Sequence, residues 1–265
     1  MRDCTTVAGT DVLQWRRQQL ARGGTAADLD WLLDLAAGLR WASLQRLLLD
    51  PTRTVALEQS LEVLSELWER HLHGNVPLQH LVGLCPWRDV LLESSPAALI
   101  PRQETELLVD LAMGQFTTTP PARWADLGTG SGAIAVALAR AWPTAPGHGV
   151  DLSSDALQLA ERNLERCAPH HNCSLHLGSW WSPLKSWWGS LDLVVSNPPY
   201  IPSAVVDGLE AVVRDHEPHL ALLGGADGLD AIRTVVDGAL MGLSPGGWLL
   251  LEHHHDQSAQ VMQLL

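Results

Sequence analysis

The segment WADLGTGSG, residues 124–132, is the strongest indicator of the fold because it joins an apolar strand to a helix through closely spaced glycines. Glycines at such a turn let the backbone pass close to a ligand, as in nucleotide-binding sites. The following residues, Ala133–Ala141, have helical periodicity. Gly128, Gly130 and Ala133 also fit the pattern G-x-G-x-x-A, so the loop by itself leaves a nicotinamide-dependent oxidoreductase open.

Downstream of this loop, apolar strand-like segments alternate with helical ones. The alternation predicts an α/β fold with a parallel, doubly wound, Rossmann-like sheet. The predicted helices include Ala133–Ala141 and Ser154–Cys167. The predicted strands are Trp124–Leu127, His148–Leu152, Leu175–Gly178, Leu191–Ser196 and Gly247–Glu252. His253–His255 lead into another apolar-periodic stretch, which favours a continuing helix over a purification tag.

Upstream, the pattern is different. Apolar residues at helical spacing over residues 11–75, including the run Val55–Leu72, predict a small all-helical domain. Short apolar segments at 87–92 and 98–100 flank Ser94-Ser95-Pro96 and predict a linking β-hairpin. A helical period returns at Thr105–Met113. The predicted domains are therefore 1–75, helical and assigned to substrate recognition; 76–104, the linker and hairpin; and 105–265, the α/β domain.

Composition narrows the class of protein. The chain has 17 Lys and Arg against 30 Asp and Glu, a formal net charge of −13. This charge repels a phosphate backbone, so direct nucleic-acid binding is disfavoured and a basic protein partner is permitted. The four cysteines form no CxxC pair, which predicts a reducing cytoplasm. No apolar run approaches the roughly 18 residues of a membrane helix, and the 12 histidines show no ligand frame, so we expect neither a membrane span nor a metal.

Asp151 follows the glycine loop by about 20 residues, at the end of the next predicted strand. A carboxylate at this place can accept hydrogen bonds from both hydroxyls of a ribose. The alternative is that Asp151 only caps the helix that begins near Ser154. The spacing indicates an adenosine-containing ligand.

The segment Asn197-Pro198-Pro199-Tyr200 follows the apolar strand Leu191–Ser196, at the sheet edge where ligands bind. An Asn side chain and a proline-fixed backbone carbonyl can accept hydrogen bonds from both N–H groups of a planar nitrogen. These bonds would turn the nitrogen lone pair toward an electrophilic methyl. Tyr200, the one tyrosine in the chain, would cover the planar group. The alternative is a proline-rich turn with Tyr200 simply packed.

Several motifs in the same order resemble the HemK/PrmC family of peptide chain release factor glutamine methyltransferases. They are Pro77–Gly83, Leu99–Glu106, Asp126–Gly132, Asn197–Tyr200, Glu217-Pro218 and Leu251–His253. The resemblance implies a seven-stranded, class I methyltransferase domain behind the helical domain. It also implies methyl transfer from S-adenosyl-L-methionine, without a metal, to the side-chain amide nitrogen (N5) of the glutamine in the Gly-Gly-Gln loop of release factors 1 and 2.

The resemblance also implies roles for individual residues. Asp151 would hold the ribose, Trp180 would flank the adenine, and Asn197 would bridge the cofactor and substrate sites. The residues that line the methionine part of the cofactor would be Gly128, Thr129, Gly130, Ser131 and Gly132. The catalytic and substrate-binding residues would be Asn197, Pro198, Pro199 and Tyr200, with Arg102, Thr105 and Glu106 closing the site. The alternative for Arg102 and Glu106 is a surface ion pair at spacing i, i+4.

Some positions depart from the family pattern. His80 stands where an aromatic residue is common, and Ser179 replaces the usual Asp before Trp180, which predicts weaker cofactor binding. Trp180 and Trp181 are adjacent, so their roles could be exchanged. The chain stops soon after Glu252, so we expect the last strand pair to be missing.

Other functions remain open at this level. The same N-P-P-Y segment serves enzymes that methylate nucleobase amino groups, and a ribosomal-protein glutamine is another possible acceptor. A non-catalytic cofactor-binding module would predict binding without transfer.

Overall fold

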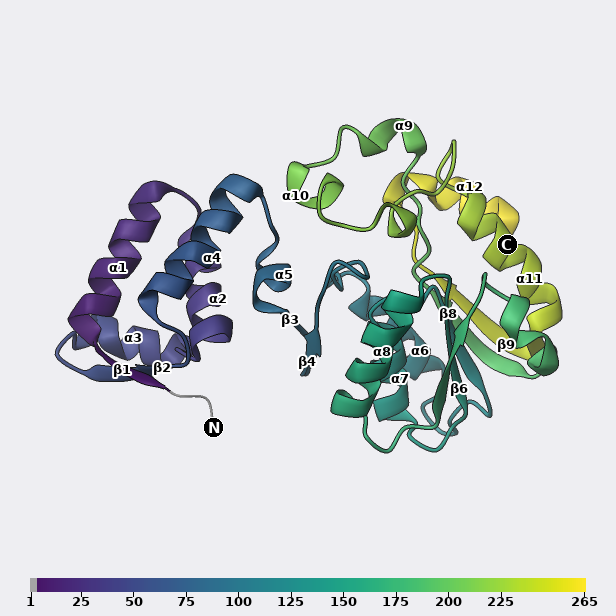
Figure 1. Ribbon diagram of the computed structural model, residues 1–265. Helices are drawn as coiled ribbons and strands as arrows, with labels where there is room; N and C mark the ends of the chain where they lie inside the picture. The colour runs from purple at the N-terminus through teal and green to yellow at the C-terminus, as the bar shows by residue number, and fades with distance from the viewer. Residues whose placement is uncertain (1–3) are drawn as a thin grey trace. The chain divides into compact units, whose positions relative to one another are not determined.

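A computed structural model describes residues 4–265, which divide into two compact units (Figure 1). The first unit extends to Leu84 and the second comprises Cys85–Leu265. Each unit has its own apolar core. Among the described residues, no helix combines the length and the apolar character needed to cross a membrane.

The N-terminal unit packs amphipathic helices around a leucine-rich core that includes the fully buried Trp68. Side-chain caps set where two of these helices begin: Thr25 accepts a hydrogen bond from the Asp28 amide, and Ser60 accepts one from the Val63 amide. The helices are α1 (Gly9–Arg22), α2 (Ala26–Ala37), α3 (Trp41–Leu49), α4 (Leu61–Gly74) and α5 (Leu78–Val82).

This unit is not all-helical, which corrects the prediction. Strands β1 (Thr5–Ala8) and β2 (Thr54–Leu57) pair antiparallel, with Thr5 opposite Leu57. The expected helix Val55–Leu72 is therefore wrong at its start. Residues 54–57 include two β-branched side chains, and the partner strand lies about 50 residues away in sequence, so local periodicity did not reveal the pairing.

The expected hairpin exists, but with different strands. They are β3 (Leu84–Trp87) and β4 (Val90–Glu93), so the turn falls at Arg88 and Asp89, inside the first predicted strand. Arg88 has a φ of 50°, the left-handed conformation that a tight hairpin turn requires. Residues 98–100, predicted as the second strand, have no regular secondary structure.

The C-terminal unit is built on a parallel five-stranded sheet in the order β7-β6-β5-β8-β9. This order has its switch point between β5 and β8, where open α/β sheets bind their ligands. The strands are β5 (Trp124–Leu127), β6 (Gly147–Asp151), β7 (Cys173–Leu177), β8 (Leu191–Ser196) and β9 (Leu243–Leu251). The Rossmann-like prediction is confirmed. The resemblance implied seven strands, and the expected shortfall of one strand pair is observed within residues 4–265.

Helices cover both faces of the sheet (Figure 1). On one face, α6 (Glu106–Gln115), α7 (Ala133–Ala141) and α8 (Ser154–Cys167) pack against alternate strand residues such as Trp124 and Leu193. On the other face, α11 (Asp230–Gly242) and the 3-10 helix η1 (Ser182–Trp187) pack on Ala125, Leu127 and Val194. Because both faces are covered, the central strand β8 is buried along nearly its whole length, with Asp192 alone partly exposed.

Short elements complete the unit around the carboxyl edge of the sheet. Between β8 and α11 lie α9 (Ser203–Val206), α10 (Ala211–Arg214) and η2 (His219–Ala221). After β9 lie η3 (His255–Gln257) and α12 (Ser258–Leu264). The histidine run thus leads into a helix, as predicted, and His254 forms the N-cap of η3.

Candidate active site

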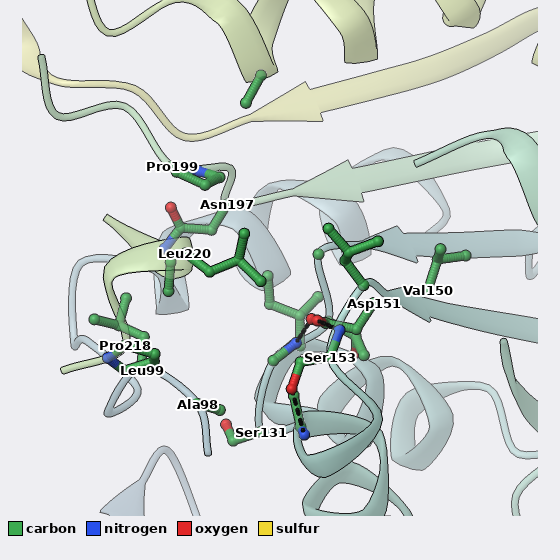
Figure 2. A pocket seen from close by; sticks show the side chains of 18 of the residues that line it. Ala98, Leu99, Ser131, Val150, Asp151, Ser153, Asn197, Pro199, Pro218 and Leu220 are labelled. Carbon is green, nitrogen blue, oxygen red and sulfur yellow. Dashed lines mark hydrogen bonds between the residues drawn. The ribbon is translucent and has the colours of Figure 1, made fainter. Parts of the chain in front are cut away.

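A cavity of about 400 Å³ lies at the carboxyl edge of the sheet (Figure 2). The ends of β5, β6 and β8 contribute to it, together with residues 97–105, residues 218–223 and the first turns of α11. Figure 2 shows Asp151 and Asn197 reaching it from two different strand ends, with Pro218 and Leu220 on another part of its wall. Its volume suits one small molecule of a few hundred Å³.

The glycine loop, Gly128–Gly132, forms one wall of this cavity. Its three glycines all have left-handed φ angles, 75°, 55° and 80°. A Cβ at Gly132 would lie 3.0 Å from the Cα of Ala160, so both the backbone conformation and the close approach of α8 require glycine there. The amides of Gly128 and Thr129 both donate to the Val150 carbonyl, at 2.8 and 2.9 Å, which ties the loop to the end of β6.

Beneath the loop, Asp126 is fully buried and accepts a hydrogen bond from the Thr129 hydroxyl at 2.6 Å. Burial raises the pKa of Asp126 to about 7 because the charged form loses its hydration. A carboxyl with this pKa exchanges a proton near neutral pH.

Asp151 supports the loop with its own carboxylate. One oxygen accepts from the Gly130 amide at 2.8 Å and the other from the Ser153 amide at 2.9 Å. The helix cap of α8 is Ser153, whose hydroxyl accepts from the Ala156 amide, so the alternative of Asp151 as that cap is wrong. Asp151 lines the cavity, and each of its oxygens keeps a lone pair that can accept a further hydrogen bond.

The two adjacent tryptophans have different places. Trp180 lines the cavity, and its ring lies 3.3 Å from where a Cβ on Gly128 would be. Trp181 is buried against α11, where its indole N–H donates to the Val235 carbonyl at 3.0 Å. Ser179 also lines the cavity. Only Trp180 of this pair is therefore available to a ligand there.

Asn197 belongs to a chain of hydrogen bonds. Its Nδ2 donates to the Thr105 hydroxyl at 3.0 Å, which donates to Glu252 at 2.7 Å. The Tyr200 hydroxyl donates to the other Glu252 oxygen at 3.3 Å. Burial and the neighbouring Glu252 raise the pKa of Tyr200 to about 12, so Tyr200 stays a neutral phenol. Asn197, Pro199 and Thr105 line the cavity, whereas Pro198 and Tyr200 lie beside it.

Arg102 and Glu106 do not pair with each other, so the alternative of an i, i+4 ion pair is wrong. Arg102 lines the cavity and binds the buried Glu217 at 2.9 Å, while Glu217 also accepts from the Ile100 amide. Glu106 instead accepts from the Arg88 amide at 3.1 Å and thereby holds the hairpin turn. Of the two, Arg102 alone reaches the cavity wall.

Some residues of the site were missed in the sequence. Asn163 is fully buried, accepts from the Glu93 amide and donates to the Ser131 carbonyl at 2.9 Å, so it ties the glycine loop to β4. A polar residue on the apolar face of α8 was the available signal. Asp230 and Thr234 of α11 also line the cavity. No motif marked them.

Comparison with known proteins agrees with this geometry. Residues 104–222 match the family model of the methyltransferase small domain. A release factor glutamine methyltransferase from Prochlorococcus marinus is 56% identical over 257 residues, which cover 96% of this chain and 88% of that protein. The proteins of the same name from Gloeobacter violaceus and Synechocystis sp. are 45% and 37% identical, over 95% and 98% of this chain and 87% and 89% of theirs. The chain therefore belongs to the release factor glutamine methyltransferase family.

Proposed function

We propose that this protein transfers a methyl group from S-adenosyl-L-methionine to the N5 amide nitrogen of the glutamine in the Gly-Gly-Gln motif of release factors 1 and 2, in the cytoplasm. The observation that carries the proposal is the side-chain amide of Asn197 at the wall of the cavity that Asp151 and Trp180 also line. The names of the related proteins support the choice of acceptor.

The cavity residues fit the methyl donor. Asp151 would accept hydrogen bonds from the ribose hydroxyls, and Trp180 would stack beside the adenine. The glycine loop would pass the methionine part at close range because its glycines lack side chains. Ser179 would offer the adenine amino group one hydroxyl acceptor. When bound, the sulfonium supplies an electrophilic methyl and a good leaving group.

The chain's own residues would then orient the acceptor. The Asn197 Oδ1 and the Pro198 carbonyl would accept the two N–H groups of the glutamine amide, with Pro199 and Tyr200 beside its plane. The nitrogen lone pair would form the new N–C bond as the S–C bond breaks and its electrons stay on sulfur. The two acceptors would stabilise the positive charge that grows on nitrogen until its proton leaves to water.

We assign Arg102, which is on the cavity wall, to the substrate side, and Glu106 to support of the hairpin turn. We assign the N-terminal segment 1–75 to recognition of the protein substrate, ahead of the linker 76–104 and the methyltransferase domain 105–265. An exposed apolar face of α3 supports this assignment, since Trp41 and Leu49 are 65% and 88% exposed.

The Trp41→Ser, Leu49→Ser double variant tests the role of this face. We expect its KM for the release factor to rise and its KM for the cofactor to stay unchanged. An unchanged KM for the release factor would reject the assignment of this face.

The test is transfer of radiolabelled methyl to four acceptors in parallel. They are purified release factor, its Gly-Gly-Gln variant with alanine in place of glutamine, ribosomal proteins, and nucleic acid. We expect label in the release factor, lost in the variant. Label in ribosomal protein or nucleic acid alone would replace the acceptor and keep the methyltransferase. Bound cofactor with no label in any acceptor would indicate a non-catalytic module.

A further inference from the structure

The two ends of the Asn197 side-chain amide do different chemistry. Only the oxygen can accept a hydrogen bond from an acceptor N–H, and the nitrogen can only donate. The two orientations of this amide have nearly the same shape, so packing does not choose between them. Hydrogen-bond partners must therefore decide which end reaches the substrate.

The chain of hydrogen bonds from Glu252 makes this choice. As a carboxylate, Glu252 only accepts, so the Thr105 hydroxyl must give its one proton to Glu252, 2.7 Å away. The Thr105 oxygen is then left as an acceptor toward Asn197, 3.0 Å away. Only the Nδ2 end of Asn197 can satisfy it, which leaves Oδ1 for another donor.

The fold holds both partners firmly. Thr105 is buried directly before α6, and 5% of its surface is exposed. The Glu252 amide donates to the Ser196 carbonyl at 3.0 Å, which extends the β8–β9 ladder to the residue before Asn197. The second Glu252 oxygen accepts a hydrogen bond from the Tyr200 hydroxyl, so one carboxylate binds Tyr200 directly and Asn197 through Thr105.

We propose that Glu252 is a positioning residue that, acting through the Thr105 hydroxyl, keeps the carbonyl oxygen of Asn197 turned toward the acceptor amide. The inference rests on the proposed function only for the identity of that acceptor. Any planar nitrogen that presents an N–H to Asn197 requires the same orientation.

Two matched pairs of variants test the chain of hydrogen bonds. Thr105→Val removes the hydroxyl at nearly constant shape, and Thr105→Ser keeps it. Glu252→Gln replaces one carboxylate oxygen by an NH₂ group, which can donate a hydrogen bond to Thr105 and so permits Asn197 to turn its amide over. The control is Glu161→Gln, at an exposed glutamate of α8. We expect kcat to fall about 10- to 100-fold in Thr105→Val and about 10-fold in Glu252→Gln. Thr105→Ser and Glu161→Gln should stay within about 3-fold of wild type, and KM for the cofactor should change less than about 3-fold throughout.

The variants act in series, so the Thr105→Val, Glu252→Gln double variant should be no slower than Thr105→Val alone. Multiplied losses in the double variant, or a Thr105→Ser variant as slow as Thr105→Val, would overturn the proposal.

Two spectroscopic readouts do not depend on turnover. The chain has four asparagines, so the side-chain amide signals of an asparagine-labelled sample are few, and Asn197→Ala identifies the Asn197 pair. In Thr105→Val and Glu252→Gln, we expect the two Asn197 amide signals to change their chemical shifts and to lose protection from hydrogen exchange. In Thr105→Ser, the chemical shifts and the protection should be retained. Tyr200 is the one tyrosine, so tyrosinate absorbance reports it alone, and its titration should move to lower pH in Glu252→Gln.

These outcomes separate the two proposals. A wild-type chain that methylates no release factor overturns the proposed acceptor, and the spectra still decide the positioning role. Unchanged Asn197 signals in both Thr105→Val and Glu252→Gln overturn the positioning role, whatever the acceptor.

Discussion

Two segments follow neighbouring strands of one sheet and are held in place by different means. The glycine loop after β5 is fixed by its backbone: its glycines are left-handed, and its amides donate hydrogen bonds to Val150 and Asp151 of the adjacent strand β6. The Asn197–Tyr200 segment after β8 is fixed by side chains from distant parts of the chain, Thr105 and Glu252. A backbone-fixed loop should be damaged by an added Cβ, and a segment fixed by side chains should be damaged by loss of a polar group.

The largest effect is expected at Asn197. Asn197→Ala removes the acceptor proposed to stabilise positive charge on the substrate nitrogen, so kcat should fall about 10²- to 10³-fold. The Kd for the cofactor, measured by calorimetry, should weaken much less. Asn172→Ala, at an exposed asparagine, is the control and should leave both unchanged. Retained turnover in Asn197→Ala would remove this side chain from the reaction.

The second largest effect is expected when a methyl group is added to the glycine loop. Gly132→Ala places a Cβ 3.0 Å from Ala160 at a φ of 80°, which should cost about 2–3 kcal/mol of unfolding free energy and weaken cofactor binding. Gly189→Ala has nearly the same φ, 74°, and no neighbouring atom within 4 Å, so it should cost about 1 kcal/mol. Urea unfolding of both variants separates the contact from the backbone strain. Equal losses would show that the approach of α8 is unimportant.

A smaller effect is expected where the loop meets β6. The Asp151 carboxylate accepts hydrogen bonds from two backbone amides, and Asp151→Asn places an NH₂ group, which can only donate, against one of them. Because that hydrogen bond is lost, cofactor binding should weaken about 10-fold. At saturating cofactor, kcat should stay within about 3-fold of wild type. Asp155→Asn, an exposed residue of α8, is the control. A loss confined to kcat would place Asp151 in the reaction itself.

The smallest effect is expected in how the free energy of unfolding depends on pH. The pKa of Asp126 is raised to about 7 in the folded chain, whereas an unfolded aspartate has its ordinary pKa of 3.8. The stability that this group contributes is therefore full below pH 3.8 and is lost as pH rises through 7. Asp126→Asn cannot ionise, so its unfolding free energy should rise by about 1–2 kcal/mol relative to that of wild type between pH 6 and pH 8.

Urea unfolding of both chains at the two pH values measures this change. A constant difference between them would show that Asp126 does not titrate in this range.

The sequence predicted best the elements whose residues contact near neighbours in the chain. The bounds of β5, β8, α7 and α8 agree with the predictions because buried strands are mostly apolar and amphipathic helices repeat every 3.6 residues. It failed where an element depended on a distant partner. β1 and β2 pair across about 50 residues, and the hairpin turn at Arg88 is held by Glu106.

From sequence patterns we could infer the parallel sheet, the glycine loop, the place of Asn197–Tyr200 at a strand end and, through the motifs, the family. The folded structure was needed to show that Trp180 rather than Trp181 lines the cavity, and that Arg102 binds Glu217, 115 positions away. It also joined Thr105 to Glu252 across 147 positions. Local patterns specify which face of an element is apolar, whereas contacts over such separations depend on the sheet register and on how helices pack across it.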